Sequence, residues 1–209
     1  MGPKAELHHY FRQGREALLW KLDGVSEYDA RRPLTPTGTN LLGLVKHTAI
    51  VVAGYFGVVF DRPFPHPLPW AEETAEPNDD MWALPGETRA QIVTLFHDAN
   101  AHADATVEAL DLDSPGHVPW WSGPVTLSRI LVHVVAEVHR HAGHTDIVRE
   151  AVDGVAGLRA DNANLAEGDA AWWAGYRARV QAEAERYRED RHPSGLHGPS
   201  TGCATDTRV

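Results

Sequence analysis

Five side chains that can bind a metal ion lie within three turns of one predicted helix, which runs from near Thr126 to about Val152. Residues three or four positions apart share a helix face. One side of the helix therefore carries four of them, while the fifth, His139, points nearly the opposite way. Imidazole and carboxylate groups gathered on one face are the ligands that zinc and similar ions bind. The four that share a face are His133, Glu137, His141 and His144.

A further candidate, His47, lies in a separate apolar segment. If the two helices pack side by side, His47 supplies a ligand that faces the first helix, as in other bundle sites. Two imidazoles and one carboxylate leave a coordination position open for water or substrate, which is typical of catalytic zinc. Iron, nickel and manganese accept the same ligands.

The spacing leaves an alternative open, because Glu137 and the histidines could also form a hydrogen-bonded polar seam without a metal. It also leaves the ligand pairs open, since Glu137 can pair with His133, His141 or His144. Lys46, next to His47, is expected to be a solvated charge, with binding of an anionic substrate as the alternative.

The elements that must position these residues are helical. Apolar stripes and stop signals predict four long helices and a fifth shorter one, and no alternating strand pattern of any length appears. The class is therefore all-α and the simplest architecture is a four-helix bundle with an extra C-terminal helix. The expected helices are about 4–22, 39 or 40 to 60, 87–110, 126–152 and 169–187.

The same patterns predict the domain organisation. Residues 1–160 form the bundle, 161–190 form a C-terminal helical extension, and 191–209, rich in Gly, Pro, Ser and Thr, form a disordered tail. Long loops follow the second and third helices, and loops of such length are often functional.

Composition restricts the partners. The formal net charge of −10 argues against a nucleic-acid-binding surface, which normally carries a basic stripe. In the apolar segment around His47, the stretch Thr48–Phe60 is shorter than the roughly 20 residues of a membrane span. The only cysteine is Cys203, and the N-terminus has no run of signal-peptide type, so we expect a cytoplasmic protein without disulfides.

Two motifs resemble a known family. The segments NLLGLVKH, at 40–47, and RHAGHTDIVREAVDGVAG, at 140–157, look like the mini-circle-protein branch of the DinB/YfiT-like superfamily, which is related to mycothiol-dependent maleylpyruvate isomerase. The resemblance covers most of residues 1–160. It implies a four-helix bundle with an up-up-down-down crossover, and often a homodimer.

The resemblance also implies a ligand set. Members hold a divalent metal with one residue of the second helix and two residues, four apart, of the fourth. Carried over, these are His47, Glu137 and His141, with Glu137 in the place that is histidine in the commoner version. His144 remains a neighbour that could orient a ligand or act as a base. Zinc is the expected ion.

Several members of the superfamily use low-molecular-weight thiols such as mycothiol, which implies a metal-dependent thiol S-transferase or isomerase acting on a small molecule. Because thiols near pKa 8.5 are mostly protonated at neutral pH, coordination to an ion would produce the reactive thiolate. Two alternatives stay open. One is metal-assisted hydrolysis through the same open position, and the other is a non-catalytic, metal-stabilised binding protein.

Overall fold

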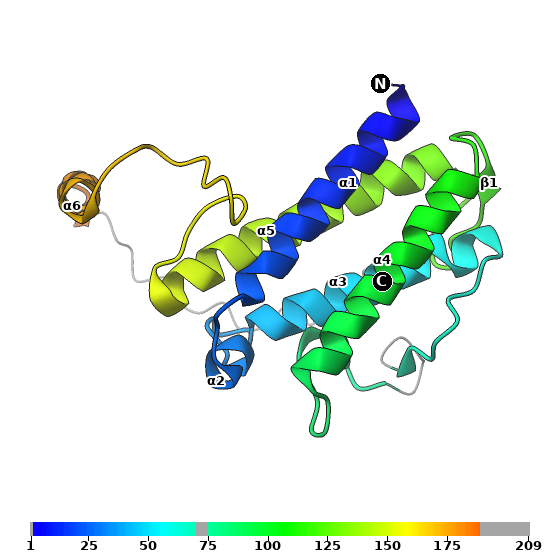
Figure 1. Ribbon diagram of the computed structural model, residues 1–209, viewed down its shortest axis with the longest axis horizontal. Helices are drawn as coiled ribbons and strands as arrows, with labels where there is room; N and C mark the ends of the chain where they lie inside the picture. Colours follow the sequence, from blue (N-terminus) through cyan, green and yellow to red (C-terminus); the bar gives the residue numbers. More distant parts are fainter. Residues whose placement is uncertain (1, 70–74, 189–209) are drawn as a thin grey trace. The chain divides into compact units, whose positions relative to one another are not determined.

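The computed structural model describes residues 2–69 and 75–188. These residues fall into two compact units, with the boundary between Ala163 and Asn164. The first unit contains four long helices, which confirms the predicted all-α class (Figure 1). The long helices are α1 (Pro3–Leu19), α3 (Leu41–Phe56), α4 (Arg89–Ala109) and α5 (Leu127–Asp153).

The helices pack as two parallel pairs. Helix α3 lies beside α4 and α1 beside α5 (Figure 1). Thr106 near the end of α4 donates to the Phe56 carbonyl at the end of α3 (3.0 Å), so α3 and α4 run in the same direction. Lys21, just after α1, donates to the Gly157 carbonyl just after α5 (2.5 Å), so this pair is also parallel.

The two pairs run in opposite directions. Along the chain, the order is therefore up-down-down-up, and the expected up-up-down-down crossover is wrong. His8 and Arg15 of α1 meet Asp104 and Asn100 of α4 in reversed order, as antiparallel neighbours do. The long crossing connection is the one between α3 and α4, because two parallel helices that follow each other need a return path along the bundle.

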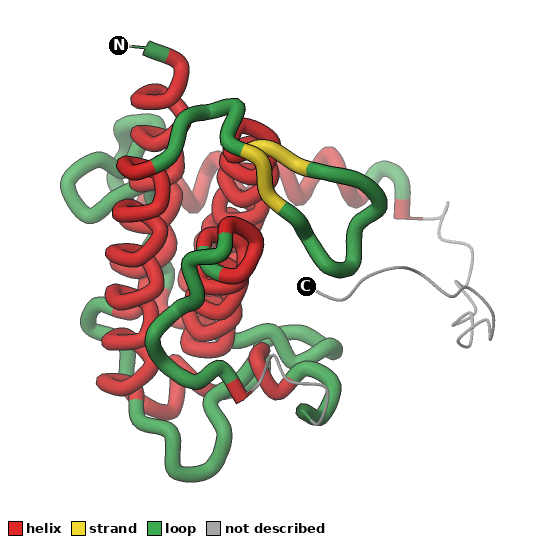
Figure 2. The backbone as a smooth tube through the Cα atoms, turned by 90° about the vertical axis from the view of Figure 1, so that its right-hand side faces the viewer, coloured by secondary structure: helices red, strands yellow, loops and turns green. Residues whose placement is uncertain are grey.

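Short elements fill the connections. The two-residue strands pair in antiparallel register, Pro115 with Thr126 and Gly116 with Val125 (yellow in Figure 2), and are too short to show an alternating sequence pattern. The short helices are α2 (Glu27–Arg31) and the 3-10 turns η1 (Trp20–Leu22), η2 (Val58–Phe60) and η4 (Asp79–Met81), and the strands are β1 (Pro115–Gly116) and β2 (Val125–Thr126).

The ends of the helices follow local chemistry. The Asn40 side chain accepts from the Gly43 amide (2.8 Å) and so caps α3, which places the start of the helix at the later of the two expected positions. Thr126 caps α5 in the same way. Helix α5 ends at Gly154, whose left-handed φ of 78° suits glycine.

Helix α3 occupies the centre of the bundle. Every residue of α3 except Gly54 is buried. The segment Leu41–Phe60 is long and apolar enough to cross a membrane, but 89% of its most apolar window is buried inside the protein. Its apolar character is therefore explained by packing on three sides, against α2, α4 and α5.

The second unit contains α6 (Ala170–Glu185), capped by Asp169, whose carboxylate accepts from the Trp172 amide (2.8 Å). Near its start Trp172 stacks on Tyr176 with nearly parallel rings. The expected disordered tail, 191–209, lies outside the described residues.

Candidate metal centre

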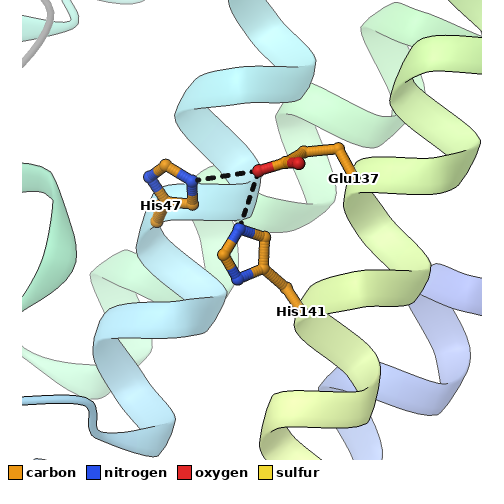
Figure 3. Close-up of side chains that lie close together, drawn as sticks. All are labelled: His47, Glu137 and His141. Atoms are coloured by element: carbon orange, nitrogen blue, oxygen red, sulfur yellow. Dashed lines mark hydrogen bonds and ion pairs between the residues drawn. The ribbon is translucent and has the colours of Figure 1, made fainter. Parts of the chain in front are cut away.

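Helices α3 and α5 bring three of the predicted ligands together (Figure 3). His47 comes from α3, and Glu137 and His141 come from adjacent turns of α5. The His141 Nε2 atom lies 2.8 Å from Glu137 Oε1, and the His47 Nε2 atom lies 3.7 Å from the same oxygen. One carboxylate oxygen therefore lies between two imidazole nitrogens.

The donor atoms fit a divalent ion. One donor atom from each residue lies within 4.8 Å of the others. Ligands bound at about 2.0–2.2 Å around a tetrahedral ion are roughly 3.4 Å apart. The 3.7 Å pair is close to that separation, and the 2.8 Å pair would reach it if the Glu137 carboxylate rotated away from His141.

The neighbours of Glu137 and His47 shift the pKa values of these two side chains. Hydrogen bonds from His141 and then from His47 hold the pKa of Glu137 well below its usual range, although burial alone would raise it. Burial alone would lower the pKa of His47, but the Asp80 and Glu137 carboxylates outweigh it and raise that pKa to about 9. Without a metal, the two carboxylates therefore stabilise the protonated form of His47.

Each histidine of the cluster has a partner on its other ring nitrogen. His47 Nδ1 lies 2.5 Å from Asp80 Oδ2, on η4. His141 Nδ1 lies 3.3 Å from His144 Nδ1, one turn along α5. His144 therefore contacts a predicted ligand without joining the group of three.

The other histidines of α5 are directed elsewhere. His139 Nε2 lies 3.0 Å from the Tyr10 carbonyl, on the α1 side of the helix, as its predicted direction requires. His133 packs edge-to-face against Tyr55 and Trp121, with ring centroids 4.8 Å away in both cases. These contacts place His133 in an aromatic group one turn beyond Glu137.

The expectation that Lys46 is a solvated charge is wrong. Its side chain is fully buried, and its ammonium donates to the Asp79 and Trp82 carbonyls (2.7 and 2.9 Å) and to Glu87 Oε2 (2.8 Å). These acceptors are distant in sequence, so no local pattern around Lys46 could reveal them. The sequence also contained no sign that Asp80 contacts His47, because Asp80 is distant in sequence and lies in a connection without a periodic pattern.

Comparisons with known proteins identify the family. Residues 6–154 match the family model described as mycothiol S-transferase, and the chain belongs to this family. The match confirms the predicted DinB-like superfamily. A search of the curated proteins found no match.

A solved structure supports the fold. It is described as a conserved protein from Enterococcus faecalis, and it aligns with a TM-score of 0.59 and 16% sequence identity. The alignment covers 74% of this chain and 99% of that protein. At this identity, the likeness concerns the fold alone.

Proposed function

We propose that this protein is a divalent-metal-dependent enzyme that uses a low-molecular-weight thiol, as an S-transferase or isomerase. The observation that carries the proposal is the His47, Glu137 and His141 cluster in a chain of the mycothiol S-transferase family. Family membership favours a thiol over water as the reacting group, which ranks the hydrolase alternative lower.

The three side chains would hold the ion through two imidazole nitrogens and one carboxylate oxygen. Zinc suits this ligand set, and nickel, iron and manganese are the alternatives. With three protein ligands, an ion keeps an open position, where it would lower the pKa of a bound thiol. The described part of the chain contains no cysteine, so the thiol has to come from a cosubstrate such as mycothiol.

The residues of the chain have separate tasks in this scheme. Glu137 stays ionised and supplies the negative charge that compensates an ion. His144 contacts the outer nitrogen of His141 (3.3 Å), which suits a residue that orients this ligand or accepts a proton. In an S-transfer, the sulfur forms a bond to an electrophilic carbon and the leaving group departs with the bonding electrons, whereas in an isomerisation the added sulfur is itself expelled again. The thiol proton passes to a base.

The test begins with protein purified without a nickel column and analysed for bound metal. We expect stoichiometric divalent ion in the wild type and its loss in Glu137→Ala and His141→Ala. His139→Ala is the matched control, since His139 lies on the same helix but bonds to the Tyr10 carbonyl. Metal retained in His141→Ala at wild-type affinity would refute the ligand assignment.

A second measurement tests the chemistry. The metal-loaded protein is incubated with small electrophiles, with and without mycothiol, and loss of the electrophile and of the thiol are both followed, because an isomerase would regenerate its thiol. Turnover only with thiol supports the transferase or isomerase, and turnover without it supports the hydrolase. Metal binding with neither activity would favour a non-catalytic binding protein. We also propose that the protein is a cytoplasmic homodimer, and light scattering on the purified protein tests the dimer.

A further inference from the structure

The turn η4 presents a carboxylate to the outer nitrogen of His47. Asp80 Oδ2 lies 2.5 Å from His47 Nδ1, while His47 Nε2 faces Glu137. A carboxylate on one imidazole nitrogen fixes the ring orientation and leaves the other nitrogen free to bind an ion. Asp80 therefore determines which atom of His47 points into the cluster.

The backbone of η4 is bound to α3 at both of its ends. Lys46 Nζ donates to the Asp79 and Trp82 carbonyls, on either side of Asp80. Asn40 Nδ2 donates to the Met81 carbonyl (3.2 Å). The position of the Asp80 backbone thus depends on α3, the helix that carries His47.

A glycine permits this close approach. A Cβ atom built on Gly43 would lie 1.8 Å from the Met81 carbonyl oxygen, which is far inside any allowed contact. Gly43 lies one turn before His47 on α3. Any side chain at this position would push η4, and Asp80 with it, away from the helix.

The buried charge that binds η4 is itself compensated. Glu87 Oε2 accepts from Lys46 Nζ (2.8 Å) and from the Leu84 amide (2.7 Å). Glu87 lies two residues before α4 begins. The contacts that bind η4 to α3 therefore also connect the first part of α3 to the start of α4, and the two helices run parallel.

We propose that Asp80 is a positioning residue for the metal ligand His47, and that Lys46 and Gly43 hold it in place. This inference rests on the proposed metal centre and adds a fourth residue, from the long α3–α4 connection, on which the affinity of that centre depends. Carboxylates in this position typically contribute 10- to 100-fold to metal affinity.

The test compares the zinc affinity of Asp80→Ala with that of Asp79→Ala by competition with a chelator. The two variants remove the same charge from neighbouring positions, but the hydrogen bond that Asp79 accepts from Lys46 is to its backbone carbonyl, which alanine retains. We expect Asp80→Ala to lose about 10- to 100-fold in affinity, and Asp79→Ala to stay close to the wild type. Asp80→Asn, whose amide oxygen can still accept from Nδ1–H, should recover part of the loss.

A spectroscopic readout separates positioning from general destabilisation. The visible spectrum of the Co²⁺-substituted protein reports ligand geometry, and we expect it to change in Asp80→Ala and in Gly43→Ala, with circular dichroism verifying that both fold. The variant that combines Asp80→Ala with Gly43→Ala should lose no more zinc affinity than Asp80→Ala alone, because both changes remove the contact between Asp80 and His47.

The outcomes distinguish the two proposals. If the wild type binds zinc and Asp80→Ala binds it equally well with an unchanged Co²⁺ spectrum, the positioning role is refuted and the metal centre stands. If the wild type binds no divalent ion, the metal centre fails, and the positioning role fails with it.

Discussion

His47 lies between two carboxylates, Asp80 on one nitrogen and Glu137 on the other. In the metal-free protein both nitrogens can donate only when the ring is protonated, and the two acids raise its pKa from 6.5 to about 9. An ion and a proton therefore compete for the same nitrogen. Metal affinity should rise with pH across this interval.

The same shift predicts how the stability of the metal-free protein depends on pH. A folded-state pKa above the unfolded value means that His47 contributes its full stabilisation below about pH 6.5 and loses it as the pH rises through about 9. Urea unfolding of the chelator-treated protein at a series of pH values should show this decline. In His47→Gln the decline should be smaller, and an identical slope in both proteins would contradict the assignment.

The candidate site could be predicted only in part from the sequence. The i, i+4 spacing of Glu137 and His141 follows from helix geometry, whereas the choice of these two over His133 came from the family resemblance. Asp80 could not be found, because it meets His47 across 33 positions of irregular chain. Lys46 was misjudged because burial of a lysine depends on acceptors from distant segments.

Helices α1 and α5 pack closely at Gly14. A Cβ atom on Gly14 of α1 would lie 2.9 Å from Val138 Cγ1 on α5 and 3.0 Å from the His139 ring. Val138 is fully buried in the core, so α1 and α5 are in close contact one residue from Glu137. Glycine is required here for space and not for its backbone conformation.

Gly14→Ala should therefore lower the free energy of unfolding by about 1–3 kcal/mol, the usual range for overpacking. Gly143→Ala is the matched control, because Gly143 is exposed on α5 and has nothing within 4 Å of a new Cβ. This control should stabilise by about 0.5–1 kcal/mol through helix propensity. Equilibrium denaturation measures both, and a stabilising Gly14→Ala would show that the two helices can separate at no cost.

Helix positions were predictable from apolar periodicity and end signals, and the four long helices lie close to the expected ranges. Their directions were not. The order up-down-down-up depends on contacts such as Thr106 with Phe56, between residues 50 positions apart. The strands at Pro115–Gly116 and Val125–Thr126 are held by pairing with each other and leave no periodic trace in two residues.

In the whole chain, the residues of the proposed activity all belong to the first of the two units. The family match ends at residue 154, and the three candidate ligands, Asp80 and His144 all belong to the first unit. A protein that ends at Ala163 should therefore bind zinc with the affinity of the full chain. Chelator competition on both proteins tests this, and weaker binding by the shorter one would show that the second unit supports the site.

The candidate ligands come from both α3 and α5, so a bound ion would also affect the unfolded chain. His47 and Glu137 are roughly 90 residues apart, so an ion bound to both closes a long loop, as a disulfide would, and restricts the disordered states available to the chain. The protein has no internal disulfide to do this, since its single cysteine has no partner in the chain. A bound ion would act as a reversible crosslink that a chelator can open.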